Sequence, residues 1–260
     1  MIPKVIHYCW FGRGKKSAQF RMCLDSWKKF LPEYQLKEWN EDNFDVNSVP
    51  YVKEAYENRK WSFVTDYVRL YALYHEGGVY MDCDVEVLKP LDRFLSDVAF
   101  TGYENVGHPL TGIMASEKGG KWVEDMMLDY DGKHFVNEKG ELDLTQNTTY
   151  AHRVMEKKGL RLDQTEENVP GYVHLYPWQF FCPKKWDTGE IMLSEDTYTI
   201  HHYVSSWLPW QGKIARWFTK HGHGLVGYFV AYFLRRPDIL FLDMLDFLLV
   251  KVLRVKKCGK

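Results

Sequence analysis

Apolar and polar residues alternate along the first hundred positions in two spacings, which predict strands and helices in turn. The clearest helical spacing lies in residues 62–75, where an apolar stripe recurs every three or four residues: Phe63, Tyr67, Leu70 and Tyr74. Gly77 and Gly78 follow directly and can end that helix. Short runs rich in aliphatic and aromatic residues are typical of strands: KVIHYCWF (4–11), YQLKEWN (34–40) and VYMDCDVEVL (79–88).

The same pattern predicts the remaining elements and the domain organisation. Further helices are expected at 17–30, 119–128 and 145–158, and further strands at 98–102, 111–115, 173–176 and 198–203. Strands that alternate with helices favour an α/β fold, with a mostly parallel central sheet flanked by helices. After residue 210 the chain becomes helix-like, aromatic and finally basic. We therefore expect one domain over residues 1–210 and a helical extension over residues 211–260.

Charge and cysteine content narrow the class of protein. The chain has 34 Lys and Arg against 35 Asp and Glu, so no overall positive field favours nucleic acid as a partner. The five cysteines are scattered without a CxxC pair, which argues against a zinc site and favours reduced thiols in the cytoplasm. The first residues lack the pattern of a secretory signal. No run of about 18 uncharged apolar residues predicts a transmembrane helix.

Asp82 and Asp84 are the first candidate chemical groups. Side chains alternate along a strand, so in a continuous strand these carboxylates share one face with Tyr80 and Glu86. Aspartate is a poor strand former, and two of them in one short strand need a reason. Two carboxylates suit a hard divalent cation that keeps positions free for substrate phosphates. The alternative interpretation is an edge strand with a solvated acidic face.

Asp66 and Arg69 form a second candidate pair on the preceding helix. They are three residues apart and therefore lie on the same side of the helix. A carboxylate beside a guanidinium can bind sugar hydroxyls and phosphate. The alternative is an ordinary surface ion pair, which would contribute little.

The segment SFVTDYVRLYALYHEGGVYMDCDVEVLKPL (62–91) closely resembles the core of the glycosyltransferases that carry a DXD sugar-binding motif. That family includes bacterial capsule and lipopolysaccharide sugar transferases and the Golgi initiating mannosyltransferases, and the large glucosylating toxins are more distantly similar. IPKVIHYCWFG (2–12) resembles the family's first strand, and HHYVSSW (201–207) resembles its closing motif. The resemblance implies a GT-A type fold, a nucleotide-sugar donor, a divalent cation, usually Mn²⁺ or else Mg²⁺, and retention of anomeric configuration.

The resemblance also implies roles for residues at matching positions. Asp82 and Asp84 would hold the metal, with Asp84 the more direct ligand, and His202 lies where a relative has a metal ligand. Donor contacts would come from residues along the whole domain: Trp10 on the base, Tyr80 near the nucleotide, Asp66 and Arg69 on the hexose, Asp82 on ribose or sugar hydroxyls, and Thr111 and Gly112 under the sugar. Ser205 and Trp207 would donate hydrogen bonds on the β-phosphate side. The segment 144–153 lacks the family's usual Gly-Pro, which leaves the acceptor contacts open.

We interpret the chain as a metal-dependent, retaining hexosyltransferase of bacterial surface-polysaccharide synthesis, with a UDP-hexose donor and a saccharide or lipid-linked saccharide acceptor. A GDP-mannose donor is the nearest alternative. Other classes are a metal-dependent phosphohydrolase and a non-catalytic carbohydrate-binding protein. A same-face substitution is favoured over double displacement, for which Asp66 is the candidate nucleophile. The stabilisation of the departing diphosphate would contribute most to the rate.

The C-terminal segment bears on localisation. Its apolar residues are interrupted by Arg235, Arg236 and Pro237, and basic residues gather near the end: Lys251, Arg254, Lys256 and Lys257. This pattern predicts a helical anchor on an anionic membrane surface. The expected location is the inner face of the bacterial cell membrane. A helical hairpin packed on the domain or on a second subunit is the alternative.

Overall fold

The computed structural model describes residues 1–104, 107–204 and 210–221. The chain divides into two compact units, of which the first comprises Met1–Trp186 with Glu190–Trp207 and the second Asp187–Gly189 with Leu208–Lys260. The described residues of the second unit include one helix, α7 (Trp210–Lys220). The predicted membrane-surface anchor lies outside the described residues. Among the described residues no helix is long and apolar enough to cross a bilayer.

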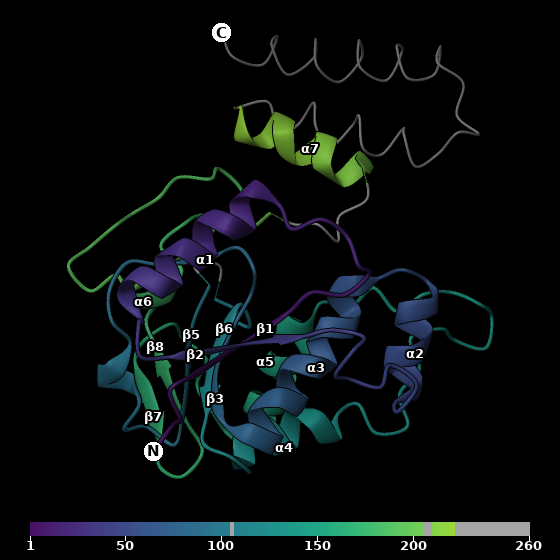
Figure 1. Cartoon of the computed structure of the whole chain (residues 1–260), viewed down its shortest axis with the longest axis horizontal. Coiled ribbons are helices and arrows are strands. Elements are labelled where there is room, and N and C mark those ends of the chain that lie inside the picture. Colours follow the sequence, from purple (N-terminus) through teal and green to yellow (C-terminus); the bar gives the residue numbers. More distant parts are fainter. Residues whose placement is uncertain (105–106, 205–209, 222–260) are drawn as a thin grey trace, which may run out of the picture. The chain divides into compact units, whose positions relative to one another are not determined.

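The first unit is built on a seven-stranded sheet with the order β2-β1-β3-β6-β5-β8-β7 (Figure 1). The strands are β1 (Val5–Cys9), β2 (Gln35–Trp39), β3 (Gly78–Met81), β5 (Ala99–Gly102), β6 (Ile113–Ser116), β7 (Glu167–Val169) and β8 (Val173–Tyr176). Five of them run in one direction, because β2, β1 and β3 are mutually parallel and β5 and β8 follow the same sense. Strands β6 and β7 run against their neighbours. The expected α/β class with a mostly parallel central sheet is confirmed.

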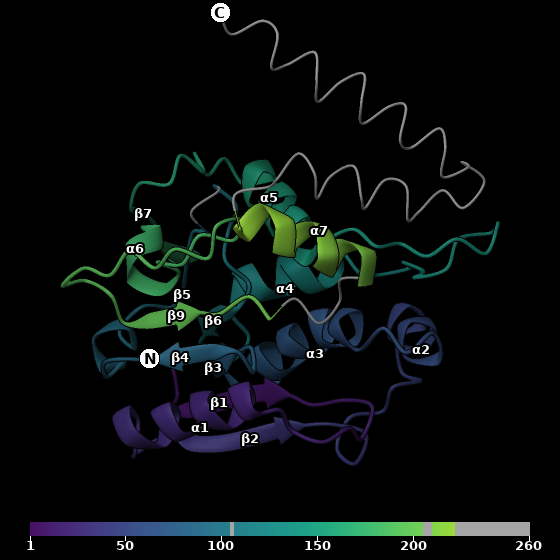
Figure 2. The ribbon, with the colours of Figure 1, turned by 90° about the horizontal axis from the view of Figure 1, so that it is seen from above.

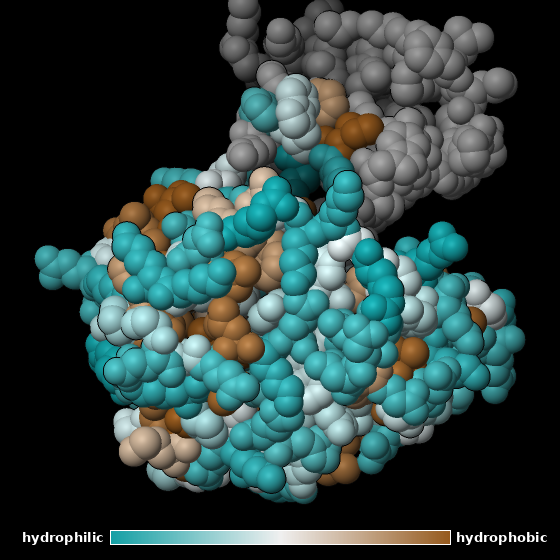
Figure 3. Space-filling model, viewed as in Figure 1, coloured by the Kyte–Doolittle hydropathy of each residue, from teal (hydrophilic) through white to brown (hydrophobic). Residues whose placement is uncertain are grey.

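Helices cover both faces of this sheet. They are α1 (Ala18–Phe30), α2 (Pro50–Glu57), α3 (Trp61–Glu76), α4 (Lys121–Leu128), α5 (Asn147–Lys157) and α6 (Trp178–Phe181), with a 3₁₀ turn at Asp92–Phe94. One core packs α2, α3, α4 and α5 against the sheet, and a second packs α1 and α6 on the other side. Figures 1 and 2 show these two groups of helices on opposite sides of the strands. On the face seen in Figure 3, polar side chains predominate and apolar side chains form scattered groups.

The stripe that predicted the helix at 62–75 forms only part of the buried side of α3, because Tyr67 and Tyr74 are half-buried. Phe63 and Leu70 are almost fully buried, and Val64, Val68 and Leu73 are completely so. The helix ends at Gly77, whose φ of +69° is the left-handed conformation that glycine adopts without strain. A side chain on Gly77 would also meet the backbone nitrogen of Lys118 at 2.7 Å. The chain therefore turns directly from α3 into β3, which carries the acidic motif.

The prediction of one continuous strand over residues 79–88 is wrong. The segment forms two strands in two sheets, because β3 ends at Met81 and β4 (Val85–Val87) pairs antiparallel with β9 (Thr199–His201). Between them Asp82 N donates to Gly112 O at 2.8 Å, and Val85 N donates to Asp82 O at 3.0 Å, which closes a turn. The two aspartates therefore lie in a turn between sheets rather than on one face of a strand.

Candidate active site

A cavity of about 640 Å³ opens where β1 and β3 end. Trp10 follows β1 and Asp82 follows β3, and both line this cavity. Asp66 and Arg69 on α3 line it from another side. Ligands of open α/β sheets bind outside the carboxyl ends of strands, so the position agrees with the one expected for a nucleotide site.

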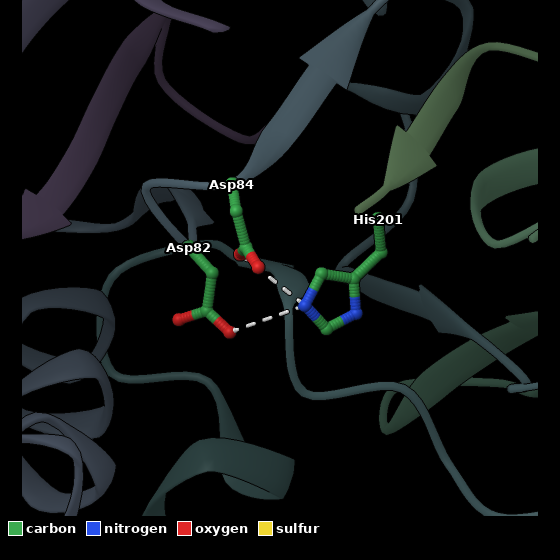
Figure 4. Close-up of side chains that lie close together, drawn as sticks. All are labelled: Asp82, Asp84 and His201. Atoms are coloured by element: carbon green, nitrogen blue, oxygen red, sulfur yellow. Dashed lines mark ion pairs between the residues drawn. The ribbon is translucent and has the colours of Figure 1, made fainter. Parts of the chain in front are cut away.

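Asp82, Asp84 and His201 converge in this cavity (Figure 4). His201 Nε2 lies 3.3 Å from Asp84 Oδ1 and 3.9 Å from Asp82 Oδ2. The three side chains offer ligand atoms that all lie within 4.8 Å of one another. Two carboxylate oxygens and one imidazole nitrogen suit Mn²⁺, and Mg²⁺ would use the oxygens. The donor set therefore fits the divalent cation that the DXD resemblance implies.

The aspartates are held by several hydrogen bonds. Asp84 Oδ2 accepts from Val204 N at 2.7 Å, and Asp82 Oδ1 accepts from the Tyr80 hydroxyl at 2.7 Å. Burial would raise the pKa of Asp84, but the charge of His201 and the hydrogen bonds from His201 and Val204 N lower it to about 2. Burial alone would lower the pKa of His201. The charge of Asp84 outweighs burial and raises the pKa of His201 well above its usual value. These opposite pKa shifts favour an ion pair of Asp84 and His201 when no metal is bound, and a divalent cation would take the place of the imidazole proton.

The histidine beside the motif is His201 rather than His202, the residue predicted from the sequence. His202 Nε2 lies 2.8 Å from Glu86 Oε2, on the far side of the β4–β9 pair. The register of that pair sets Val85 opposite His201, and neighbouring residues of a strand point to opposite faces. His201 therefore faces the turn that carries Asp82 and Asp84.

The Asp66–Arg69 pair is buried and is not a surface ion pair. Arg69 Nη2 lies 3.1 Å from Asp66 Oδ1 and 3.4 Å from Asp82 Oδ1, and Arg69 Nη1 donates to Thr111 O at 2.6 Å. Burial raises the pKa of Asp66 to about 7, although the Arg69 charge acts in the opposite direction. One guanidinium thus connects the helix carboxylate with the DXD motif.

The aromatic residues expected at the donor differ in exposure. Trp10 is half-buried, stacks on Phe20 with ring centroids 5.3 Å apart, and donates through Nε1 to Gly14 O at 2.8 Å. Its position lines the cavity, where an indole can stack on a base. Tyr80 is 1% exposed and lies beneath Arg69, whose guanidinium carbon is 4.6 Å from the ring centroid.

The other predicted donor residues fall partly within the described chain. Thr111 lines the cavity. Gly112 lies against the metal-site residues, because a Cβ there would meet the His201 ring at 3.1 Å and Asp82 Oδ2 at 3.4 Å. Ser205 and Trp207 lie outside the described residues.

Two cavity residues were missed in the sequence. Asn147, the first residue of α5, donates from Nδ2 to Asp66 Oδ1 at 2.7 Å, and its Oδ1 accepts from Thr111 Oγ1 at 2.9 Å. Glu104 lines the cavity after β5, and burial raises the pKa of its carboxyl to about 7. Glu104 belongs to no local motif, and Asn147 lies in the segment 144–153, to which no residue role was assigned. Only the long-range packing of the chain identifies these two residues.

Comparisons with known proteins address the same region. Residues 17–101 match the family model described as "Glycosyltransferase sugar-binding region containing DXD motif". Inositol phosphoceramide mannosyltransferase 2 of Schizosaccharomyces pombe is 30% identical over 103 residues, which cover 36% of this chain and 28% of that protein. Inositol phosphoceramide mannosyltransferase 3 of the same yeast is 26% identical over 125 residues, covering 45% and 34%. The chain thus spans no more than 34% of the length of either relative.

Solved structures similar to this chain include two glycosyltransferases. The PaToxG glycosyltransferase has a TM-score of 0.46 at 16% identity and covers 60% of this chain and 70% of its own. A glycosyltransferase involved in glycosylation of the major capsid of PBCV-1 has a TM-score of 0.44 at 13% identity and covers 85% and 99%. The resemblance noted in the sequence is confirmed over residues 17–101, which are similar to the DXD-containing sugar-binding region of glycosyltransferases.

Proposed function

We propose that this protein is a divalent-metal-dependent glycosyltransferase of the GT-A type that transfers a hexose from a nucleotide-sugar to a saccharide acceptor. The observation that carries the proposal is the meeting of Asp82, Asp84 and His201 in the cavity that Asp66 and Arg69 also line. The match of residues 17–101 to the sugar-binding region supports it. A phosphohydrolase would need the metal-binding carboxylates but gives no role to the buried Asp66–Arg69 pair.

Asp82, Asp84 and His201 would hold Mn²⁺ or Mg²⁺, which would stabilise the negative charge that develops on the departing diphosphate. Trp10 would stack on the base, as its half-buried position lining the cavity allows. Asp66 would accept a hydrogen bond from a hexose hydroxyl. Ser205 and Trp207 would donate to the diphosphate, in the role that the resemblance gives them.

Transfer with retention would proceed on one face of the sugar. The bond between the anomeric carbon and the diphosphate oxygen breaks, and its electron pair stays with the nucleoside diphosphate. The acceptor hydroxyl forms the new bond on the same face, and its proton passes to the leaving phosphate oxygen. A double displacement would instead require a carboxylate nucleophile, for which the cavity offers Asp66 and Glu104.

The donor we favour is a UDP-hexose with galactose or glucose, and the acceptor is a growing bacterial surface polysaccharide at the inner face of the membrane. GDP-mannose is a second candidate, because both curated relatives are named as mannosyltransferases. Stacking on Trp10 does not distinguish uracil from guanine, since every base has an aromatic face.

Donor hydrolysis tests the proposal directly. UDP-galactose, UDP-glucose, UDP-N-acetyl sugars and GDP-mannose are incubated with the protein and Mn²⁺, and nucleoside diphosphate release is measured. Asp84→Asn is the test variant, and Asp25→Asn, on the exposed side of α1, is the matched control. We expect release from one donor that is lost in Asp84→Asn and with a chelator. If no donor releases nucleoside diphosphate and calorimetry shows no metal-dependent binding of UDP or GDP, the proposal is wrong.

A further inference from the structure

Residues 201–204 wrap around Asp84. His202 N donates to Asp84 O at 2.9 Å, Val204 N donates to Asp84 Oδ2 at 2.7 Å, and His201 Nε2 lies 3.3 Å from Asp84 Oδ1. Three groups from four consecutive residues therefore meet a single aspartate. The geometry of the candidate metal site depends on how this short segment is held.

Tyr203 carries the turn of this segment in a strained conformation. Strand β9 ends at His201, and Tyr203 has a φ of +55°, in the left-handed region that side chains other than glycine rarely adopt. Such a conformation persists only where the surroundings over-determine it. The contacts of Tyr203 should therefore account for the shape of the turn.

Two contacts of Tyr203 are buried. Its hydroxyl is hydrogen-bonded to Cys182 Sγ at 3.0 Å, and Cys182 itself is completely buried. Its ring lies against the imidazole of His201, with centroids 4.3 Å apart. One side chain thus connects the end of helix α6 with the metal-site histidine.

The segment that carries Cys182 is itself fixed to β9. Cys182 N donates to Trp178 O at 2.8 Å and closes α6. Thr199 Oγ1 donates to Phe181 O at 2.8 Å, and Lys184 Nζ donates to His202 O at 3.0 Å. The segment around Cys182 therefore holds both the first residue of β9 and the residue that follows the strand.

His201 lacks the usual support of a metal-binding histidine. Such a residue normally donates its second ring N–H to a carboxylate or carbonyl, which fixes the ring. His201 Nδ1 is buried and has no hydrogen-bond partner among the described residues. The Cys182 thiol lies close enough to help raise the pKa of His201, but it does not supply a regular hydrogen bond. The Tyr203 ring, tilted by 36° against the imidazole at a centroid distance of 4.3 Å, is then the contact that orients it.

We infer that Tyr203 and Cys182 are positioning residues for the divalent-cation site, because the anchored Tyr203 ring holds His201 Nε2 toward Asp82 and Asp84. This inference rests on the metal site of the proposed function. Neither side chain is a metal ligand. Their role is to keep the third ligand in place, since no described residue forms a hydrogen bond with His201 Nδ1.

The test measures Mn²⁺ affinity rather than activity. The wild-type chain and the variants Tyr203→Phe, Cys182→Ala, Cys182→Ser and the double variant Tyr203→Phe/Cys182→Ala are titrated with Mn²⁺ alone, and free Mn²⁺ is read by electron paramagnetic resonance. Tyr198→Phe is the matched control, because its hydroxyl accepts from the surface residue Arg93 at 3.0 Å and lies before β9. Thermal melting of each variant reports whether the fold is retained.

We expect Tyr203→Phe and Cys182→Ala each to weaken Mn²⁺ binding roughly tenfold, the range found for residues that orient metal ligands. The double variant should lose no more than either single variant, because both remove the same hydrogen bond. Cys182→Ser should retain wild-type affinity within about threefold, since a hydroxyl can restore the bond. If the substitutions act only through a general loss of packing, the melting temperature should fall in Tyr203→Phe, Cys182→Ala and Cys182→Ser alike. Cys182→Ser would then not restore Mn²⁺ affinity, and the inference would be wrong.

Two outcomes separate the inference from the proposed function. Wild-type affinity in folded Tyr203→Phe and Cys182→Ala would overturn the inference and leave the metal site standing. Absence of Mn²⁺ binding by the wild-type chain, with or without nucleoside diphosphate, would overturn the metal site and the inference together.

Discussion

Arg69 Nη2 lies 3.1 Å from Asp66 Oδ1, and both side chains are at least 91% buried. The same nitrogen lies 3.4 Å from Asp82 Oδ1, so one cation compensates two carboxylates. Removing one partner of a buried ion pair leaves an uncompensated charge, which typically costs about 3–5 kcal/mol. The arrangement therefore makes Arg69 a residue of the fold as well as of the site.

Arg69→Met should lower the free energy of unfolding by about 3–5 kcal/mol, measured by urea denaturation at pH 8. Arg153→Met is the matched control, because Arg153 is half exposed and pairs with Asp129 at 2.9 Å. Exposed pairs contribute about 0–1 kcal/mol, so this control should stay near wild type. Equal destabilisation by the two substitutions would contradict the buried network.

Asp66 should give the stability of the metal-free protein a pH dependence. Burial raises its pKa from the usual 3.8 to about 7 in the folded state. Between these values the folded protein holds a proton that the unfolded chain has lost, so this contribution to stability falls as pH rises and is lost above about 7. The slope approaches roughly 1.4 kcal/mol per pH unit.

The check is the difference in unfolding free energy between wild type and Asp66→Asn from pH 4 to pH 8. The asparagine does not titrate. The unfolding free energy of the wild type should therefore fall relative to that of Asp66→Asn as pH rises, and the difference should become constant above about pH 7. A difference that stays constant with pH would show that Asp66 is ionised throughout.

Gly112→Ala should weaken the metal site without unfolding the protein. The added Cβ would lie 3.1 Å from His201 Cε1 and Nδ1 and 3.4 Å from Asp82 Oδ2, closer than ordinary packing at the imidazole. Displacement of ligands by such contacts should reduce Mn²⁺ affinity roughly tenfold. Gly14→Ala is the control, since its Cβ would meet nothing within 4 Å. The prediction fails if the two variants bind Mn²⁺ equally.

The parts of the fold that depend on local spacing could be predicted from the sequence. The helix expected at 62–75 is α3 (Trp61–Glu76), and the one expected at 17–30 is α1 (Ala18–Phe30), capped by Ser17. Because Asp66 and Arg69 are three residues apart on α3, their common side followed from helix geometry alone. The burial of Asp66 and Arg69 could not be predicted in this way, because it depends on Thr111 and the turn at Asp82, which belong to other parts of the chain.

The arrangement of the DXD motif depends on long-range pairing that the sequence does not reveal locally. Residues 79–88 have the spacing of one strand, but β4 leaves the central sheet to pair with β9, more than a hundred residues later. The register of that pairing also determines that His201, and not His202, faces the two aspartates. The sequence around the two histidines does not distinguish them. Asn147 became a site residue only because the start of α5 meets Asp66 of α3. Ser205 and Trp207 stay predictions.

Asn147 should influence how the donor hexose is bound, because it determines which way Asp66 faces. Its Nδ2 and Arg69 Nη2 both contact Asp66 Oδ1. Among the described residues no hydrogen bond to Asp66 Oδ2 is found, and Asp66 lines the cavity. Asn147→Asp keeps the size of the side chain but replaces a donor by a second carboxylate, which repels an ionised Asp66.

Calorimetry with Mn²⁺ should therefore show that Asn147→Asp loses roughly tenfold in affinity for the nucleotide-sugar, while the nucleoside diphosphate alone binds as in wild type. Asn147→Ala should lose less, because it removes a donor without adding a charge. Thr149→Ala, exposed in the same turn of α5, serves as the control. If Asn147→Asp binds the complete donor as tightly as wild type, the hexose does not depend on the orientation of Asp66. Equal losses for the donor and the nucleoside diphosphate would place the effect on the fold rather than on the sugar.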